Sequence, residues 1–116
     1  PLKFDTSLGE RGINLSGGQK QRLTVARALI RQSPIVIFDD SLTAVDAETE
    51  SLILGSLKEA TQKQTTIIIS HRLSSLSLCD HILVLRDGHV EAVDTPENLK
   101  KASSTYSELL SLQGYT

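Results

Sequence analysis

The sequence has no tryptophan or methionine and only two tyrosines and two phenylalanines, so its core must be aliphatic. The single cysteine, Cys79, cannot form an internal disulfide, which fits a reducing compartment and a small buried side chain. No apolar run approaches the roughly 20 residues that span a bilayer, and the first residues do not resemble a signal peptide. A formal net charge of −2 argues against nucleic acid as a partner, because such binders neutralise phosphates with excess cations.

The composition predicts one ordinary globular domain. The 116 residues allow a single modest core, and 39% hydrophobic with 22% charged residues is a usual balance.

A serine and two glycines stand directly before a predicted helix. Ser16 occupies the position of a helix N-cap, and Gly17 and Gly18 leave the first-turn N–H groups uncovered by Cβ atoms. The positive end of a helix with exposed N–H groups is a ready site for phosphate. Taken alone, the three residues are more typical of a flexible loop before a surface helix, and only the neighbouring motifs favour the phosphate interpretation.

Two apolar runs predict strands of a parallel sheet. They cover residues 35–38 and 65–70, and continuous apolar runs of this kind indicate strands buried on both faces. Asp39 and Asp40 follow the first strand, and His71 follows the second. Because α/β sheets place their chemistry at the carboxyl ends of the strands, these three residues are candidate site residues.

Helices and a hairpin complete an α/β fold. Apolar residues at helical spacing predict helices over 17–32 and 47–62. Their apolar sets are Leu23, Ala26, Leu29 and Ile30 in the first helix, and Leu52, Ile53 and Leu57 in the second. Shorter helices are expected over 73–78, 96–101 and 104–112. Asp87 and Gly88 predict a hairpin between strands over 80–85 and 89–93.

Four motifs in register resemble those of ABC-type ATPases. Residues 15–19 (Leu-Ser-Gly-Gly-Gln) spell the family signature, and residues 35–40 resemble a Walker B strand. Residues 43–46 resemble the D-loop, and residues 70–72 the switch-histidine loop. The resemblance implies the C-terminal part of a P-loop NTPase core, with a mostly parallel sheet, an antiparallel edge hairpin and flanking helices.

The resemblance also implies partners. ABC transporters hydrolyse ATP between two head-to-tail domains, so the signature would contact an ATP held by a second nucleotide-binding domain. The residues concerned are Leu15, Ser16, Gly17, Gly18 and Gln19. The transmembrane domain of the same polypeptide would be another partner, which puts the chain at the cytoplasmic face of a membrane. Residues 6–12 resemble the exporter loop that faces this membrane domain, although a plain glycine-punctuated loop explains them equally well.

In the chain's own site, the resemblance gives each candidate a role. Asp39 would hold Mg²⁺ through water, Asp40 would stand at the catalytic position, and His71 would contact the γ-phosphate. Asp46 would cross the interface to the opposite site. The alternatives are solvated acids at a strand end for Asp39 and Asp40, and a helix cap or surface group for His71.

No glycine-rich loop ending in Gly-Lys-Ser or Gly-Lys-Thr is present. The resemblance therefore makes residues 1–116 the C-terminal fragment of a nucleotide-binding domain, which we expect to be inactive alone. In this fold the Walker A strand lies between the switch-histidine strand and the strand over 80–85. We therefore expect two unpaired strand edges and marginal stability.

Asp40 departs from the family pattern, which has glutamate there. Aspartate is one methylene shorter, and a displacement of about 1 Å can cost on the order of a hundredfold in rate. This favours one half of a heterodimeric exporter whose own site is slow, with a homodimer of two slow sites still open.

Two other functions remain open, a chromosome-maintenance or DNA-repair ATPase and a non-catalytic regulatory module. The transporter-like residues 19–22, 87–90 and 96–99, and the lack of an N-terminal heptad run, favour the exporter over the DNA-repair ATPase.

Overall fold

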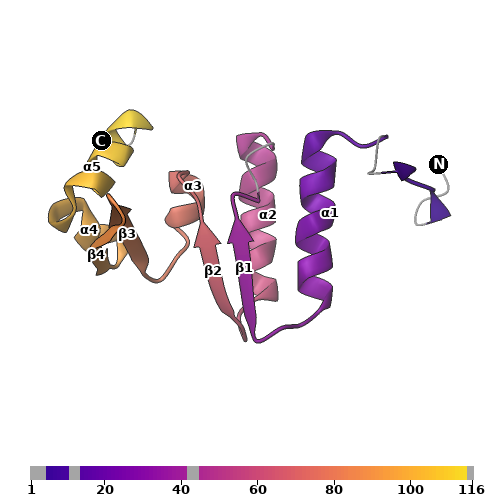
Figure 1. The fold of residues 1–116 in the computed structure, drawn as a ribbon, viewed down its shortest axis with the longest axis horizontal. Helices are drawn as coiled ribbons and strands as arrows, with labels where there is room; N and C mark the ends of the chain where they lie inside the picture. The colour runs from indigo at the N-terminus through magenta and orange to yellow at the C-terminus, as the bar shows by residue number, and fades with distance from the viewer. Residues whose placement is uncertain (1–4, 11–13, 42–44, 115–116) are drawn as a thin grey trace.

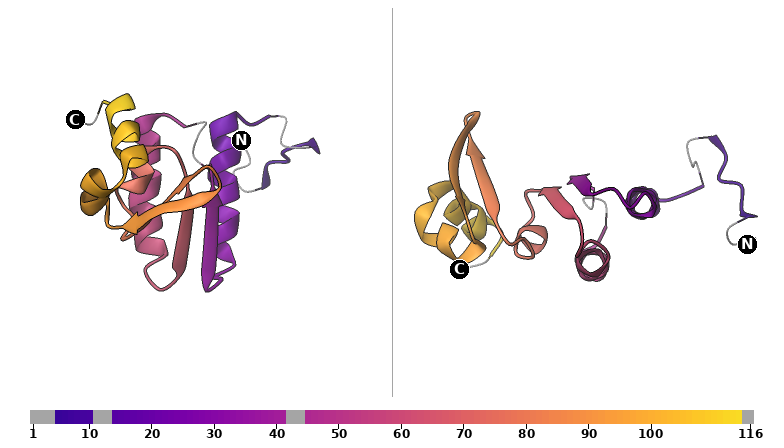
Figure 2. Two further views of the ribbon diagram at one scale, coloured as in Figure 1. Left: turned by 60° about the vertical axis from the view of Figure 1, so that its left-hand side comes forward. Right: turned by 90° about the horizontal axis from the view of Figure 1, so that it is seen from below.

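A parallel strand pair and a separate hairpin each pack against helices, and the first helix lies beside the parallel pair (Figure 1, Figure 2). The computed structural model describes residues 5–10, 14–41 and 45–114. In chain order the elements are α1 (Gly17–Ile30), β1 (Ile35–Asp39), α2 (Ala47–Ala60), β2 (Thr65–Ile69), α3 (Leu73–Leu76), β3 (Ile82–Arg86), β4 (His89–Asp94), α4 (Pro96–Ala102) and α5 (Ser104–Leu112). Among the described residues, none of the helices has the length and apolar character needed to cross a bilayer.

Every described helix except α3 begins at a side chain that caps it, as expected for Ser16. Its hydroxyl accepts from the backbone of α1, and Asp46, Thr95 and Ser103 do the same for α2, α4 and α5. Several ends fall short of the prediction. The structure ends α1, α2 and α3 two residues earlier and begins β3 two residues later than expected. Beyond α1 the chain turns at Gln32, whose φ is 48°, because Pro34 cannot continue a helix.

The four strands form two separate pairs. β1 and β2 are parallel, from Ile35 opposite Thr65 to Asp39 opposite Ile69. β3 and β4 form the predicted antiparallel hairpin, with a bulge after Val84. In the described part of the chain β2 pairs only with β1, and β3 only with β4. The parallel pair and the hairpin are thus confirmed, and both inner strand edges are unpaired as expected.

The expectation that β1 and β2 are buried on both faces is wrong. Val36 and Phe38 are buried, whereas Ile35 and Ile37 are 57% and 59% exposed. β2 likewise exposes Ile67 and Ile69. The cause is that α2 to α5 all lie on one side of the strands, and no described helix covers the other (Figure 2, right).

The predicted apolar faces of α1 and α2 are also partly wrong. Leu23, Ile30 and Leu52 are 49%, 81% and 70% exposed. Leu57 is buried as predicted, and Leu29 and Ile53 are partly buried against the same core. The other core residues of these helices are Val25 on α1 and Leu54 on α2. α1 packs on β1 and α2 also contacts α3, so a narrow stripe of each helix is buried and the rest of its apolar residues face outward.

Two small cores result, one under each strand pair. The first contains Val25, Val36, Phe38, Val45, Leu54 and Leu57, and the second contains Leu73, Leu76, Ile82, Val84, Leu99 and Tyr106. A groove of about 1110 Å³ runs between β2 and β3 and reaches α5. The molecule measures 52 × 30 × 26 Å, and its radius of gyration of 16.4 Å exceeds the roughly 13 Å of a compact domain of this size.

Candidate functional site

The start of α1 carries the glycine-rich signature. Ser16 and Gln19 form a capping box, in which Gln19 N–H donates to Ser16 Oγ at 3.2 Å and Ser16 N–H donates to Gln19 Oε1 at 2.8 Å. No acidic residue lies in the first turn, so the positive end of the helix keeps its charge. Leu15 and Gly18 are half-buried and the other signature residues are exposed. This end of α1 is therefore open to an anion.

Asp39 and Asp40 lie at the carboxyl end of β1, as predicted. Asp39 is the last residue of the strand, and the backbone N–H of Asp40 donates to Ile69 O at 3.0 Å. Asp40 has a φ of 43°, a left-handed conformation that aspartate tolerates better than most residues. The turn aims its carboxylate toward the end of β2.

His71 follows β2 and meets Asp40. Its Nδ1 lies 3.5 Å from Asp40 Oδ1, and the two side chains are 68% and 53% exposed. Parallel strands end at the same edge of a sheet, so two residues far apart in the sequence come together there. The structure thus brings together two of the three predicted strand-end residues in one contact.

Asp46 has a local role that the sequence analysis missed. Its carboxylate caps α2, accepting from Thr49 N–H at 2.9 Å and from Thr49 Oγ1 at 2.7 Å. An acidic residue three positions before threonine at a helix start was the available signal. Thr43 and Ala44 of the D-loop motif, and Arg11 and Gly12 of the segment 6–12, lie outside the described residues.

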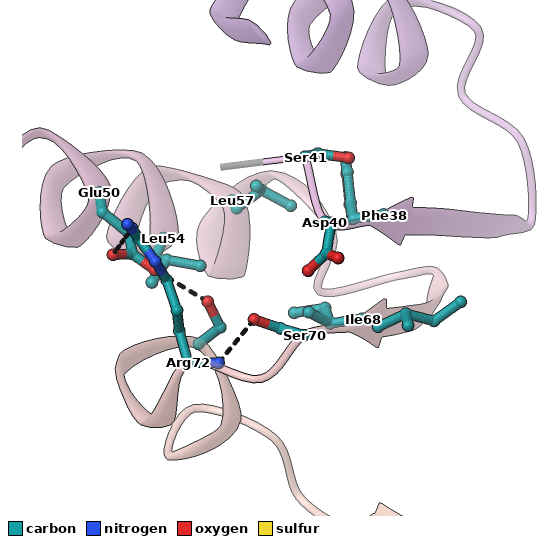
Figure 3. A pocket seen from close by; sticks show the side chains of 11 residues that line it. Phe38, Asp40, Ser41, Glu50, Leu54, Leu57, Ile68, Ser70 and Arg72 are labelled. Carbon is teal, nitrogen blue, oxygen red and sulfur yellow. Dashed lines mark hydrogen bonds and ion pairs between the residues drawn. The ribbon is translucent and has the colours of Figure 1, made fainter. Parts of the chain in front are cut away.

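Behind the strand ends lies a buried acidic network that the sequence analysis also missed (Figure 3). Glu50 of α2 is only 2% exposed. Its carboxylate accepts from Arg72 Nη1 at 2.7 Å, from Ser74 Oγ at 2.9 Å and from Ser75 Oγ at 3.0 Å. Glu50, Leu54 and Leu57 are four and three residues apart, so helical spacing places Glu50 on the buried face of α2. The network fixes the segment that follows His71 to α2.

The cavity in Figure 3 is too small for a nucleotide. It measures about 20 Å³, enough for a single water, and Asp40, Glu50, Ser70 and Arg72 are among its lining residues. A phosphate would therefore contact exposed groups rather than enter this cavity, and the start of α1 and the Asp40–His71 edge are the candidates among the described residues. Figure 1 shows both at the same end of the molecule, with α1 beside β1.

Comparison with known proteins gives the family context. The family model "ABC transporter" matches residues 2–43. Proteins of Staphylococcus aureus strains NCTC 8325 and N315, named as multidrug export ATP-binding/permease proteins, are 42% identical over 113 residues. The match covers 97% of this chain and 20% of each relative. A bacterial Atm1-family ABC exporter, solved with ATP bound, superposes with a TM-score of 0.91 at 39% identity, over 98% of this chain and 20% of that one.

The chain is homologous to ABC exporters. It spans a fifth of the length of the exporters that it matches. The TM-score of 0.91 shows that its helices and strands are arranged as in the matching part of the solved exporter.

Proposed function

We propose that this chain is the signature-bearing half of a nucleotide-binding domain in an ABC exporter, which uses ATP to drive transport. The observation that carries the proposal is the contact of 3.5 Å between His71 Nδ1 and Asp40 Oδ1 at the carboxyl ends of β2 and β1. Two motif residues meet at the edge where α/β sheets bind phosphates. The S. aureus relatives support the exporter over a DNA-repair ATPase, because they are named as export ATP-binding/permease proteins.

The signature acts on a second nucleotide-binding domain. In the proposed head-to-tail pair, the first turn of α1 points its uncovered N–H groups at the ATP of the partner. Ser16, Gly18 and Gln19 would then stabilise negative charge on the γ-phosphate. The lack of an acidic residue in this turn supports the role, since a carboxylate would repel the phosphate. Asp46, at the start of α2, would contribute to the same interface.

The chain's own site uses Asp39, Asp40 and His71. No cluster of three metal-ligating side chains exists in the described part of the chain. That fits Mg²⁺, which takes one or two carboxylates and completes its shell with water and phosphate oxygens. Asp39 would be that carboxylate, and Mg²⁺ bound with ATP would neutralise phosphate charge. His71 would hold the γ-phosphate in place.

Asp40 makes this site slow. The side chain of Asp40 is one methylene shorter than that of glutamate, and its carboxylate contacts His71. A water held about 1 Å from its best position reacts on the order of a hundredfold more slowly. We therefore infer one half of a heterodimeric exporter, joined to a transmembrane domain and working at the cytoplasmic face. If Asp40 stops turnover completely, the site is a regulatory ATP-binding module instead.

ATP hydrolysis by the full-length protein tests the proposal. The protein would be reconstituted in lipid with candidate partner subunits, and steady-state rates compared for wild type, Ser16→Arg and Asp40→Glu. We expect Ser16→Arg to abolish turnover, because it blocks the partner's site, and Asp40→Glu to increase it.

Two outcomes are informative. Unchanged turnover in Ser16→Arg would show that the signature does not complete a partner's site. Loss of turnover in Ser16→Arg without any gain in Asp40→Glu would favour the regulatory module. Arg27→Ala, at an exposed position of α1 beyond the motif, is the control for a charge change on this helix.

A further inference from the structure

The segment from Ser70 to Ser75 joins the two halves of the molecule. It lies between β2, which covers the first core, and β3, which covers the second. His71 stands in this segment with its side chain largely exposed. The position of His71 therefore depends on what holds the backbone on either side of it, because its exposed ring is not packed in either core.

Gln113, at the end of α5, holds that backbone at two points. Its Nε2 donates to His71 O at 2.5 Å, and its Oε1 accepts from Leu73 N–H at 3.1 Å. The two bonds straddle Arg72, as a neighbouring β-strand would. The amide of glutamine, with one donor and one acceptor end, is suited to this pairing.

The bond to Leu73 also supplies a helix cap. Arg72 is the N-cap of α3 but its side chain makes no capping bond. The N–H of Leu73 belongs to the first turn, which has no partner within the helix. Gln113 satisfies it from 40 residues away in the sequence. The start of α3, and with it the peptide of His71, depends on the last turn of α5.

Gln113 is itself held in place. Its N–H bonds to Leu109 O, which completes the last turn of α5. Gly114 follows with a φ of 77°, a conformation that favours glycine and ends the helix there. At the other end of α5, Tyr106 is 4% exposed and anchors the helix in the second core. The amide of Gln113 is thus presented from a fixed support.

We propose that Gln113 is a positioning residue for His71, and that α5 sets the distance between His71 and Asp40 through it. The inference rests on the proposed function, in which His71 contacts the γ-phosphate. Gln113 would act through the backbone of His71 and Leu73, to which the two bonds of its side-chain amide run. On the other side of the segment, Glu50 of α2 forms an ion pair with Arg72. Residues 71–73 are therefore bonded to α5 on one side and to α2 on the other.

The test uses the full-length protein with its partner subunit and with Ser16→Arg and Asp40→Glu already present. In this background the partner's site is blocked and turnover comes from the site that contains His71, and Gln113→Met is compared with the background itself. Methionine has the same length and lacks both hydrogen bonds. We expect kcat for ATP to fall between about tenfold and a hundredfold, with the KM for ATP within about twofold, because position rather than binding is lost. Hydrogen exchange should accelerate in the peptide 70–76. Gln62→Met, at an exposed turn at the far end of β2, is the matched control and should behave as the background does.

Exchange in the peptide 97–102, which contains the fully buried Leu99, reports whether the variant is folded. If Gln113→Met loses protection there, Gln113→Glu decides the question. Glutamate can still accept from Leu73 N–H but cannot donate to His71 O, so turnover should fall while α3 remains formed.

His71→Ala separates the two hypotheses. If His71→Ala abolishes turnover in this background while folded Gln113→Met, or Gln113→Glu in its place, hydrolyses ATP as fast as the background does, the positioning role is wrong and the proposed function stands. If Ser16→Arg leaves wild-type turnover unchanged and His71→Ala has no effect in the background, the proposed function fails and the inference fails with it.

Discussion

His71 Nδ1 and Asp40 Oδ1 lie 3.5 Å apart across the ends of β2 and β1. Both side chains are more than half exposed, so water screens the pair and it adds little to folding stability. Its importance is positional. The backbone of Asp40 is left-handed, with a φ of 43°, and this turn is what brings the carboxylate to the histidine.

The left-handed turn predicts different outcomes for two substitutions of Asp40. Asparagine tolerates this conformation, whereas glutamate has no local hydrogen bond to offset its strain. Asp40→Asn should therefore unfold at nearly the wild-type temperature, and Asp40→Glu should lose up to about 1 kcal/mol. Thermal unfolding of the two purified variants checks this. Equal melting temperatures would mean that the backbone relaxes at this position.

Glu50 predicts a large loss of stability on truncation. Removing its carboxylate takes away the acceptor of the Ser74 and Ser75 hydroxyls and the ionic partner of Arg72, whose Nη1 also donates to Val45 O at 3.4 Å. Because Arg72 is 30% exposed, we expect a cost of about 1–3 kcal/mol, as for buried polar groups that lose their partner. Glu50→Ala should show this loss in urea unfolding, whereas Glu59→Ala, at an exposed site of the same helix, should change stability by less than about 0.5 kcal/mol. A cost below about 1 kcal/mol for Glu50→Ala would contradict the network.

The parts of the fold that depend on neighbours in the chain could be predicted from the sequence. Ser16 and Thr95 cap helices because the cap bonds only to the next three residues, and Asp87–Gly88 makes a hairpin for an equally local reason. The placement of Asp40 and His71 at one edge of the sheet was also predictable, because parallel neighbouring strands end there. The left-handed turn at Asp40, which brings its carboxylate to the histidine, could not be predicted.

The rest depends on what packs against each face. Ile37 and Leu52 are apolar, yet no described element covers them, and hydrophobicity alone cannot say which apolar residues find a partner. The contacts of Gln113 could not be predicted from the sequence for a related reason. Its two bonds reach across 40 and 42 residues and arise only after α5 has packed on the second core. Glu50 could have been found, since its helical spacing to Leu54 and Leu57 puts a charge on a buried face.

The part of the molecule around the second core should lose stability in acid, because Glu91 becomes protonated there. Hydrogen bonds from Ser103 and Thr105, with Arg86 nearby, hold the pKa of this carboxylate below its ordinary value. A lowered folded-state pKa contributes stability that is complete above the unfolded value of about 4.3 and is lost as the pH falls through the folded value. Unfolding temperature measured from pH 6 to pH 3 should therefore fall less steeply in Glu91→Gln. The control is Glu97→Gln, and a wild-type slope in Glu91→Gln would contradict the prediction.

The uncovered face of the strands predicts self-association of the 116-residue chain in isolation. Exposed apolar side chains on β1, β2 and β3 form this face, namely Ile35, Ile37, Ile67, Ile69, Leu83 and Leu85. Surfaces of this kind bind apolar dyes and other chains. We expect dye fluorescence and concentration-dependent sedimentation, both reduced in Ile37→Thr with Ile67→Thr. Val36→Thr, on the covered face, should instead destabilise the fold. A monomer that binds no dye would show that the face is protected.

The two bonds of Gln113 also set an order of events during synthesis. The ribosome makes His71 42 residues before Gln113, an interval of about 2–8 s at about 5–20 residues per second. During that interval the four motifs have already been translated, but the backbone of His71 has no support from α5. A frameshift or stop codon shortly before Gln113 would therefore produce a protein whose four motifs are intact and in which the proposed contact of His71 with phosphate is nevertheless misaligned.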